Sequence, residues 1–130
     1  MSRHIIAPDW TVKGYEFPAD VEVTECDDLA ELSLEVIGDA DFVVLPYEGS
    51  TISISEAISR LPNVKVLQTL TAGFDNVQPH VRAGVTLCNA AGVHDDATSE
   101  LAVLLALSAL RDMPRSFRAP QEHHWETYFA

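Results

Sequence analysis

The segment that follows the apolar run at 64–70 has the composition of an anion-binding loop. It reads Thr71-Ala72-Gly73-Phe74-Asp75-Asn76, and Gly73 would allow the backbone to lie close to a ligand. Successive backbone N–H groups in such a loop can form a concave site for a small anion. The alternative is that Gly73 only makes a tight turn. The backbone amides around Ala72 and Gly73 are therefore the first candidate for substrate binding.

Two polar side chains are expected at the ends of neighbouring strands. Tyr47 follows the apolar run at 41–45, and Asn89 follows the run at 84–88. Because open α/β sheets bind ligands at the carboxyl ends of their strands, both residues are candidates for lining the same crevice. The alternatives are an aromatic side chain that packs on the first helix and an amide that caps the next turn.

The start of the last predicted helix holds further groups that could take part in chemistry. Asp95, Asp96 and Glu100 are most simply acids that complement the helix dipole. Thr98 could donate a hydrogen bond to a phosphate at the helix N-terminus. His94 is a candidate acid or base, but the sequence offers no residue that would orient its ring. We expect no catalytic residue here.

An alternation of short apolar runs and amphipathic segments must position these residues. Strands are predicted at 4–7, 21–24, 41–45, 64–70 and 85–88, and helices at 27–37, 50–60, 76–82 and 97–113. Strands that alternate with helices form a parallel sheet through right-handed crossovers. The sequence therefore predicts an α/β fold, a flavodoxin-like five-stranded parallel sheet with flanking helices.

The last predicted helix is apolar on all sides. Residues 100–110 read ELAVLLALSAL, in which Ser108 is the only polar residue after Glu100. A helix of this kind must be buried on all sides, and a domain of this size offers it only one sheet face. We therefore expect a long apolar C-terminal helix whose remaining surface packs on another domain or on a second copy of the chain.

Composition and charge narrow the classes of function. The chain has 20 acidic and 8 basic residues, for a net charge of −12, which argues against nucleic acid and anionic membranes as partners. A small anion must then be captured locally, by backbone dipoles or a single Arg. Cys26 and Cys88 match no metal spacing and are expected as free thiols, so no metal is expected. Without a signal peptide or an apolar run of about 20 residues, we expect a cytoplasmic protein.

Two longer patterns carry a resemblance to a known family. VKVLQTLTAGFDNV at 64–77 and AGVTLCNAAGVHDDATSELAVLLALSALR at 83–111, followed by Trp125, resemble the D-isomer-specific 2-hydroxyacid dehydrogenases. The resemblance implies hydride transfer between NAD or NADP and C2 of a small 2-hydroxy or 2-oxo acid. It also implies substrate-binding roles: Ala72 and Gly73 match the carboxylate-binding loop, Tyr47 lies near a position that shapes substrate preference, and Asn89 matches an Asn that contacts substrate in the formate-using members.

The same resemblance implies what this chain lacks. It contains no G-x-G-x-x-G fingerprint, and the family's ribose-binding acid and catalytic Arg, Glu and His would lie beyond residue 130. Thr98 matches a Thr that approaches the cofactor in some members. We expect a substrate-side domain at 1–96 and a crossover helix and tail at 97–130 that lead into a missing dinucleotide-binding domain, with a homodimer contact through helix 97–113.

The isolated chain is therefore expected to bind no NAD or NADP tightly and to be catalytically inactive. The alternative is a non-catalytic small-molecule-binding or dimerisation module with a flavodoxin-like fold.

Overall fold

The computed structural model describes residues 3–47, 51–118 and 121. The chain forms two compact units, Met1–Gly92 and Val93–Ala130. The strands of the first unit are β1 (Arg3–Ala7), β2 (Val21–Glu25), β3 (Phe42–Val44), β4 (Val66–Gln68) and β5 (Thr86–Cys88). Its helices are α1 (Asp9–Val12), α2 (Leu34–Gly38), α3 (Ile54–Ser59) and the short 3-10 helix η1 (Gln78–His80).

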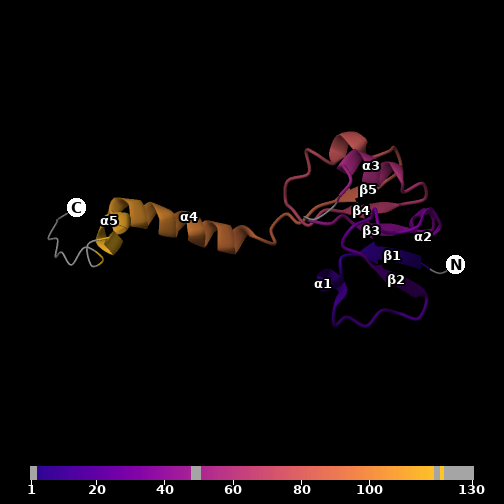
Figure 1. The fold of residues 1–130 in the computed structure, drawn as a ribbon, viewed down its shortest axis with the longest axis horizontal. Helices are drawn as coiled ribbons and strands as arrows, with labels where there is room; N and C mark the ends of the chain where they lie inside the picture. Colours follow the sequence, from indigo (N-terminus) through magenta and orange to yellow (C-terminus); the bar gives the residue numbers. More distant parts are fainter. Residues whose placement is uncertain (1–2, 48–50, 119–120, 122–130) are drawn as a thin grey trace. The chain divides into compact units, whose positions relative to one another are not determined.

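The five strands form one parallel sheet with the order β2-β1-β3-β4-β5 (Figure 1). The prediction of a five-stranded parallel sheet with flanking helices is confirmed, and the strand order is that of flavodoxin-like sheets. From β1 the chain first builds β2 on one side and then returns to build β3 on the other. The order thus reverses between β1 and β3, and a crevice opens at the carboxyl ends of strands at such a switch point.

One face of the sheet carries the hydrophobic core. Ile6, Val43 and Leu67 follow one another across β1, β3 and β4, and each is fully buried. Ile37 of α2 and Ile58 of α3 belong to the same cluster, so these two helices cover this face. Full burial of a side chain of this size contributes about 1.5–3 kcal/mol, which makes the three central strands a firm base for the loops that follow them.

The helix predicted at 27–37 is wrong over most of its length, because only α2 forms. The Asp28 carboxylate is buried and accepts hydrogen bonds from the backbone N–H of Ala30 (3.0 Å) and of Thr51 (2.8 Å). A side chain that bonds to nearby backbone in this way holds a turn and competes with a helix. The helix therefore begins later, after Ser33, whose side chain caps it.

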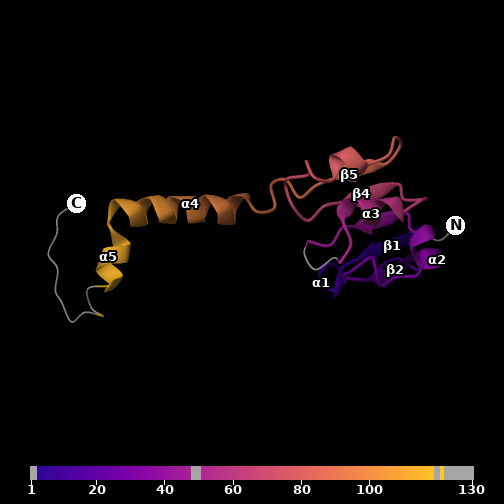
Figure 2. The same ribbon diagram turned by 45° about the horizontal axis from the view of Figure 1, so that its top comes forward.

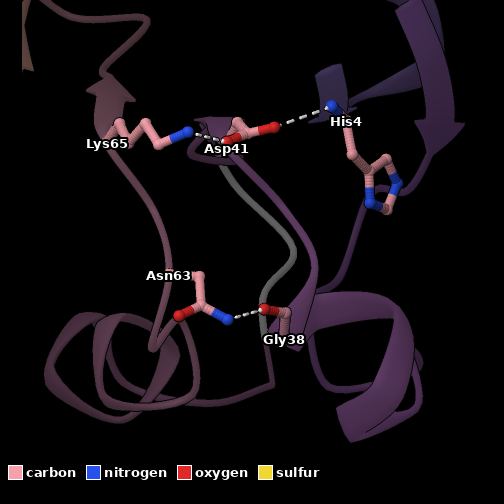
Figure 3. Close-up of polar contacts among 5 residues, drawn as sticks. All are labelled: His4, Gly38, Asp41, Asn63 and Lys65. Carbon is pink, nitrogen blue, oxygen red and sulfur yellow. Dashed lines mark hydrogen bonds and ion pairs between the residues drawn. The ribbon is translucent and has the colours of Figure 1, made fainter. Parts of the chain in front are cut away.

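Polar contacts tie the three central strands together at their amino ends (Figure 3). The Asp41 carboxylate, which precedes β3, accepts a hydrogen bond from the His4 backbone N–H of β1 (3.1 Å) and pairs with Lys65 Nζ before β4 (2.5 Å). Asn63 Nδ2 donates to the carbonyl oxygen of Gly38 (2.6 Å). These contacts fix where the strands begin.

The second unit contains α4 (Asp95–Leu110) and α5 (Met113–Arg118), and Figure 2 shows the chain turning between them. None of the residues of α4 is buried, and its apolar side chains are more than half exposed, such as Leu101 (54 %) and Leu105 (60 %). None of the helices in the described part of the chain is long and apolar enough to cross a membrane.

The predicted bounds of this last helix, 97–113, are wrong at both ends. The helix is preceded by His94 as its N-cap, so Asp95 and Asp96 lie inside the first turn and do not cap it. At the other end Asp112 adopts a positive φ of 45°, which interrupts the helix. Pro114 then lies in the first turn of α5, where its missing N–H removes no helical hydrogen bond.

Candidate functional site

The loop after β4 is held in place through its carbonyl groups. Thr69, which is buried, donates from Oγ1 to the carbonyl oxygen of Thr71 (2.9 Å), and the backbone N–H of Ala90 donates to the same oxygen (3.0 Å). Thr71 Oγ1 in turn donates to the carbonyl oxygen of Gly73 (2.6 Å). The loop carbonyls therefore point toward groups of the protein itself.

Asn89 adds a further restraint on the same loop. Its Nδ2 donates to the carbonyl oxygen of Ala72 (2.8 Å), and its Oδ1 accepts from the backbone N–H of Ala91 (3.4 Å). The structure thus brings together three residues that the sequence singled out, Ala72, Gly73 and Asn89. An amide nitrogen carries two hydrogens, so Asn89 keeps a second donor after it has bonded to Ala72.

Ala72 and Gly73 are exposed residues, and no residue that the structure describes accepts a hydrogen bond from their backbone N–H groups. Gly73 does not adopt a positive φ, so its backbone conformation does not require glycine. A Cβ placed at Gly73 would meet no described atom within 4 Å. The space next to the Gly73 Cα is therefore open, and neither its φ nor crowding at this position requires a glycine.

A depression of about 480 Å³ lies next to this loop. Phe74 and Asn89 belong to its lining, together with Leu87 of β5 and Arg82. The Arg82 guanidinium donates from Nη2 to the carbonyl oxygens of Leu61 (2.6 Å) and Pro62 (3.0 Å). Nη2 of Arg82 therefore ties two chain segments together.

The structure places Tyr47 in a different depression, of about 370 Å³. Its lining consists of Pro8, Trp10, Asp27, Pro46 and Tyr47. These residues follow β1, β2 and β3, so the depression lies at the switch point of the sheet. The sequence does not single out Trp10 or Asp27 as site residues, because only the strand order shows that the segments after β1, β2 and β3 are neighbours.

Thr98 and His94 lie at the start of α4, in the second unit, where the backbone N–H of Thr98 donates to the carbonyl oxygen of His94 (3.0 Å). Both residues are exposed. Asp95 and Asp96 place two carboxylates in the same first turn. Their charge repels a phosphate, so this helix start does not fit a dinucleotide pyrophosphate.

Both cysteines are free thiols. Cys26 is a buried free thiol, as predicted, and Cys88 is a half-buried one. Burial raises the pKa of the Cys26 thiol, whose Sγ donates to the carbonyl oxygen of Asp28 (2.9 Å), so it stays protonated and unreactive. In the described ranges, His, Cys, Asp and Glu form no group of three or more that could hold a metal ion.

The chain resembles known dehydrogenases in sequence. It is 28% identical over 86 residues to Dehydrogenase efuE of Hormonema carpetanum, a match that covers 65% of this chain and 21% of that protein. It is 31% identical over 74 residues to the D-3-phosphoglycerate dehydrogenase of Archaeoglobus fulgidus, covering 55% of this chain and 14% of that protein. The chain therefore matches only a small part of the length of these relatives.

A solved structure has the same fold. This structure was solved in work on the identification of the pyruvate reductase of Chlamydomonas reinhardtii. The similarity has a TM-score of 0.53 at 18% identity and covers 97% of this chain and 40% of that one. The family model of the D-isomer specific 2-hydroxyacid dehydrogenase catalytic domain matches residues 11–128. This chain belongs to the D-isomer specific 2-hydroxyacid dehydrogenase family and corresponds to its catalytic domain.

Proposed function

We propose that this chain is the substrate-side domain of an NAD(P)-dependent D-2-hydroxyacid dehydrogenase. Membership of the family supports the reaction class. The observation that carries the site is the loop after β4, in which the carbonyls bond to the protein while the N–H groups of Ala72 and Gly73, two exposed residues, donate to no residue that the structure describes. A carboxylate is an acceptor-only group, and therefore it suits a site made of donors.

In this proposal the substrate carboxylate accepts hydrogen bonds from the Ala72 and Gly73 amides. Asn89 holds the loop through Ala72 and offers its second amide hydrogen to the substrate. Tyr47 follows β3, the neighbour of β4, and contacts the part of the substrate beyond its carboxylate. Capture by backbone dipoles also explains how a chain with a net charge of −12 can hold an anion.

The nicotinamide cofactor would exchange a hydride with C2 of the 2-hydroxy or 2-oxo acid in the intact enzyme. The residues of this chain do not fit such a cofactor, because the sequence has no G-x-G-x-x-G fingerprint and α4 begins with two acids. We propose that residues 1–96 bind the substrate and that 97–130 form the crossover toward a separate dinucleotide-binding domain, which Thr98 approaches. The isolated chain would then be inactive.

We also propose that the chain is cytoplasmic and forms homodimers through the helix predicted at 97–113. The exposed apolar side chains of α4 support this assembly. The same observation favours a second candidate function, a dimerisation module without catalysis. Affinity for a 2-oxo acid distinguishes the two functions, because a dimerisation module is not expected to bind one.

The experiment is an NMR titration of the chain with pyruvate and with D-lactate, the smallest acids with the required groups. We expect the amide resonances of Ala72 and Gly73 to shift in a saturable way. Gly73→Pro deletes one N–H and should weaken binding about tenfold, the share of one hydrogen bond to a charged group. Gly73→Ala is the matched control, since its Cβ has room and its N–H remains. A chain whose amides respond to neither acid would contradict the proposal.

A further inference from the structure

The depression at the switch point contains groups that the carboxylate site does not use. We call it the aromatic pocket and define it by the five residues that line it, Pro8, Trp10, Asp27, Pro46 and Tyr47. Trp10 and Tyr47 are 64 % and 59 % exposed, although both are large aromatic side chains. Trp10 lies in α1, which follows β1, and Tyr47 lies in the loop after β3, so the fold brings them together from distant parts of the sequence.

The prolines make the base of the aromatic pocket rigid. Pro8 is fully buried directly after β1, and Pro46 is half-buried after β3. The backbone at Pro8 is fixed further by Thr11, which donates from both its N–H (2.9 Å) and its Oγ1 (2.7 Å) to the Pro8 carbonyl oxygen. A rigid base reduces the entropy that is lost when a ligand binds.

The chemistry of the lining selects a positive charge. The faces of Trp and Tyr rings attract cations, and the exposed Asp27 carboxylate adds an opposite charge. Among the residues that the structure describes, the lining includes no basic side chain. The net charge of −12 also draws cations toward the surface. A second carboxylate or a phosphate would be repelled by Asp27.

The aromatic pocket and the carboxylate loop lie at the same edge of the sheet. β3 and β4 are neighbours in register, with Val44 opposite Gln68, and parallel strands lie about 4.8 Å apart. Tyr47 and Ala72 each follow these paired residues by only a few positions. A ligand that is held by its carboxylate at the loop after β4 can therefore extend toward the loop after β3.

We infer that the aromatic pocket binds an ammonium or guanidinium group at the far end of the substrate, which makes the substrate a 2-hydroxy or 2-oxo acid with a cationic side chain. This inference rests on the proposed function for the position of the carboxylate. The preference of the aromatic pocket for an organic cation is a separate statement and can be tested alone.

The test uses NMR titrations of the full chain with three probes. Ethylguanidinium carries only the cation, pyruvate carries only the 2-oxo acid, and 2-oxo-5-guanidinopentanoate carries both. We expect ethylguanidinium to shift the Trp10 indole and Tyr47 ring signals. The bifunctional acid should shift these signals and the Ala72 and Gly73 amides together, and bind about fivefold tighter than 2-oxohexanoate, its neutral counterpart.

Variants test whether the fivefold tighter binding of the guanidinium acid comes from the aromatic pocket. Trp10→Leu or Asp27→Asn should abolish the fivefold difference while leaving the response of Ala72 and Gly73 to pyruvate unchanged. Tyr15→Leu is the matched control, because Tyr15 is equally exposed (73 %) but lies outside the aromatic pocket.

The possible failures are distinguishable. Without any response of Trp10 or Tyr47 to ethylguanidinium, the inference is overturned, whatever pyruvate does. If Trp10 or Tyr47 responds to ethylguanidinium but the Ala72 and Gly73 amides respond to no acid, the cation pocket would stand. The proposed function and the link to a substrate would then be removed. Equal affinities for the guanidinium acid and 2-oxohexanoate would also overturn the inference.

Discussion

Asn89 connects the last strand of the sheet to the loop that holds the free amides. Replacing it with Ala removes the hydrogen bond from Nδ2 to the Ala72 carbonyl oxygen. We expect Asn89→Ala to lower the free energy of unfolding by about 1 kcal/mol and to weaken pyruvate binding, because the loop is no longer fixed. Chemical denaturation and the NMR titration measure the two effects. Asn76→Ala, in the same loop and without a recorded side-chain hydrogen bond in the described residues, should change neither.

Asp41 gives the chain a specific acid sensitivity. Its bonds to Lys65 and then to the His4 N–H hold the pKa of this carboxyl below its ordinary value of 3.8. A lowered pKa in the folded state stabilises the fold above about pH 4. That contribution disappears as the pH falls through the lowered pKa.

The contribution of the Asp41 ion pair is measured as the difference in urea midpoint between the natural chain and Asp41→Asn. Asp41→Asn should unfold at a lower urea concentration than the natural chain at about pH 7, and the difference should shrink progressively as the pH falls below about 4. Urea midpoints measured over this pH range test the prediction. A difference that is constant with pH would mean that the ion pair with Lys65 does not contribute. Asp39→Asn, which removes a carboxylate that forms no ion pair among the described residues, is the matched control for the loss of a negative charge.

The candidate site could be predicted in part at the scale of single residues. Ala72, Gly73 and Asn89 were identified because a glycine-containing loop and an amide follow apolar runs, and both features are local. Trp10 and Asp27 could not be identified as pocket residues in this way. They reach Tyr47 only through the strand order, which depends on contacts between segments that are distant in the chain.

Helix α3 offers a test at the scale of an element. Ser53 caps it, with Oγ accepting a hydrogen bond from the Glu56 backbone N–H (3.2 Å), and Ala57 and Ile58 of this helix are in the core. We expect Ser53→Ala to cost about 1 kcal/mol of unfolding free energy. Ser55→Ala on the exposed side of α3 is the matched control. Thermal or urea unfolding that gives equal losses for both variants would contradict the capping role.

The elements differ in how far local sequence determines them. Each strand was found because an apolar run ends at Pro, Gly or a polar residue. The helix predicted at 27–37 failed because the Asp28 carboxylate bonds to Thr51, a contact that no local pattern reveals. The predicted end of α4 failed because Asp112 adopts a positive φ, a backbone conformation that the apolar pattern does not reveal.

At the scale of the whole molecule, the association of chains depends on the exposed apolar surface of α4. Leu104 and Leu107 are 59 % and 57 % exposed, and an apolar helix surface of this kind favours association. We expect a dimer by light scattering at micromolar concentration. The double variant Leu104→Glu with Leu107→Glu should restore the monomer mass while the sheet signals in the NMR spectrum stay unchanged. Ser55→Glu on α3 is the control for added charge. A natural chain that already has the monomer mass would contradict association through α4.

The contacts at the amino ends of β1, β3 and β4 have a consequence for how this domain can diversify. Asp41, Lys65 and His4 join the strands at their amino ends, and the candidate binding groups lie in the segments that follow the carboxyl ends of the strands. Tolerance to substitution is then unequal along the strand axis. Loop exchanges at 46–47 and 71–74 can retune which acid is recognised while the ion pair and the core are left intact. A new specificity could be engineered, or acquired by descent, without rebuilding the fold.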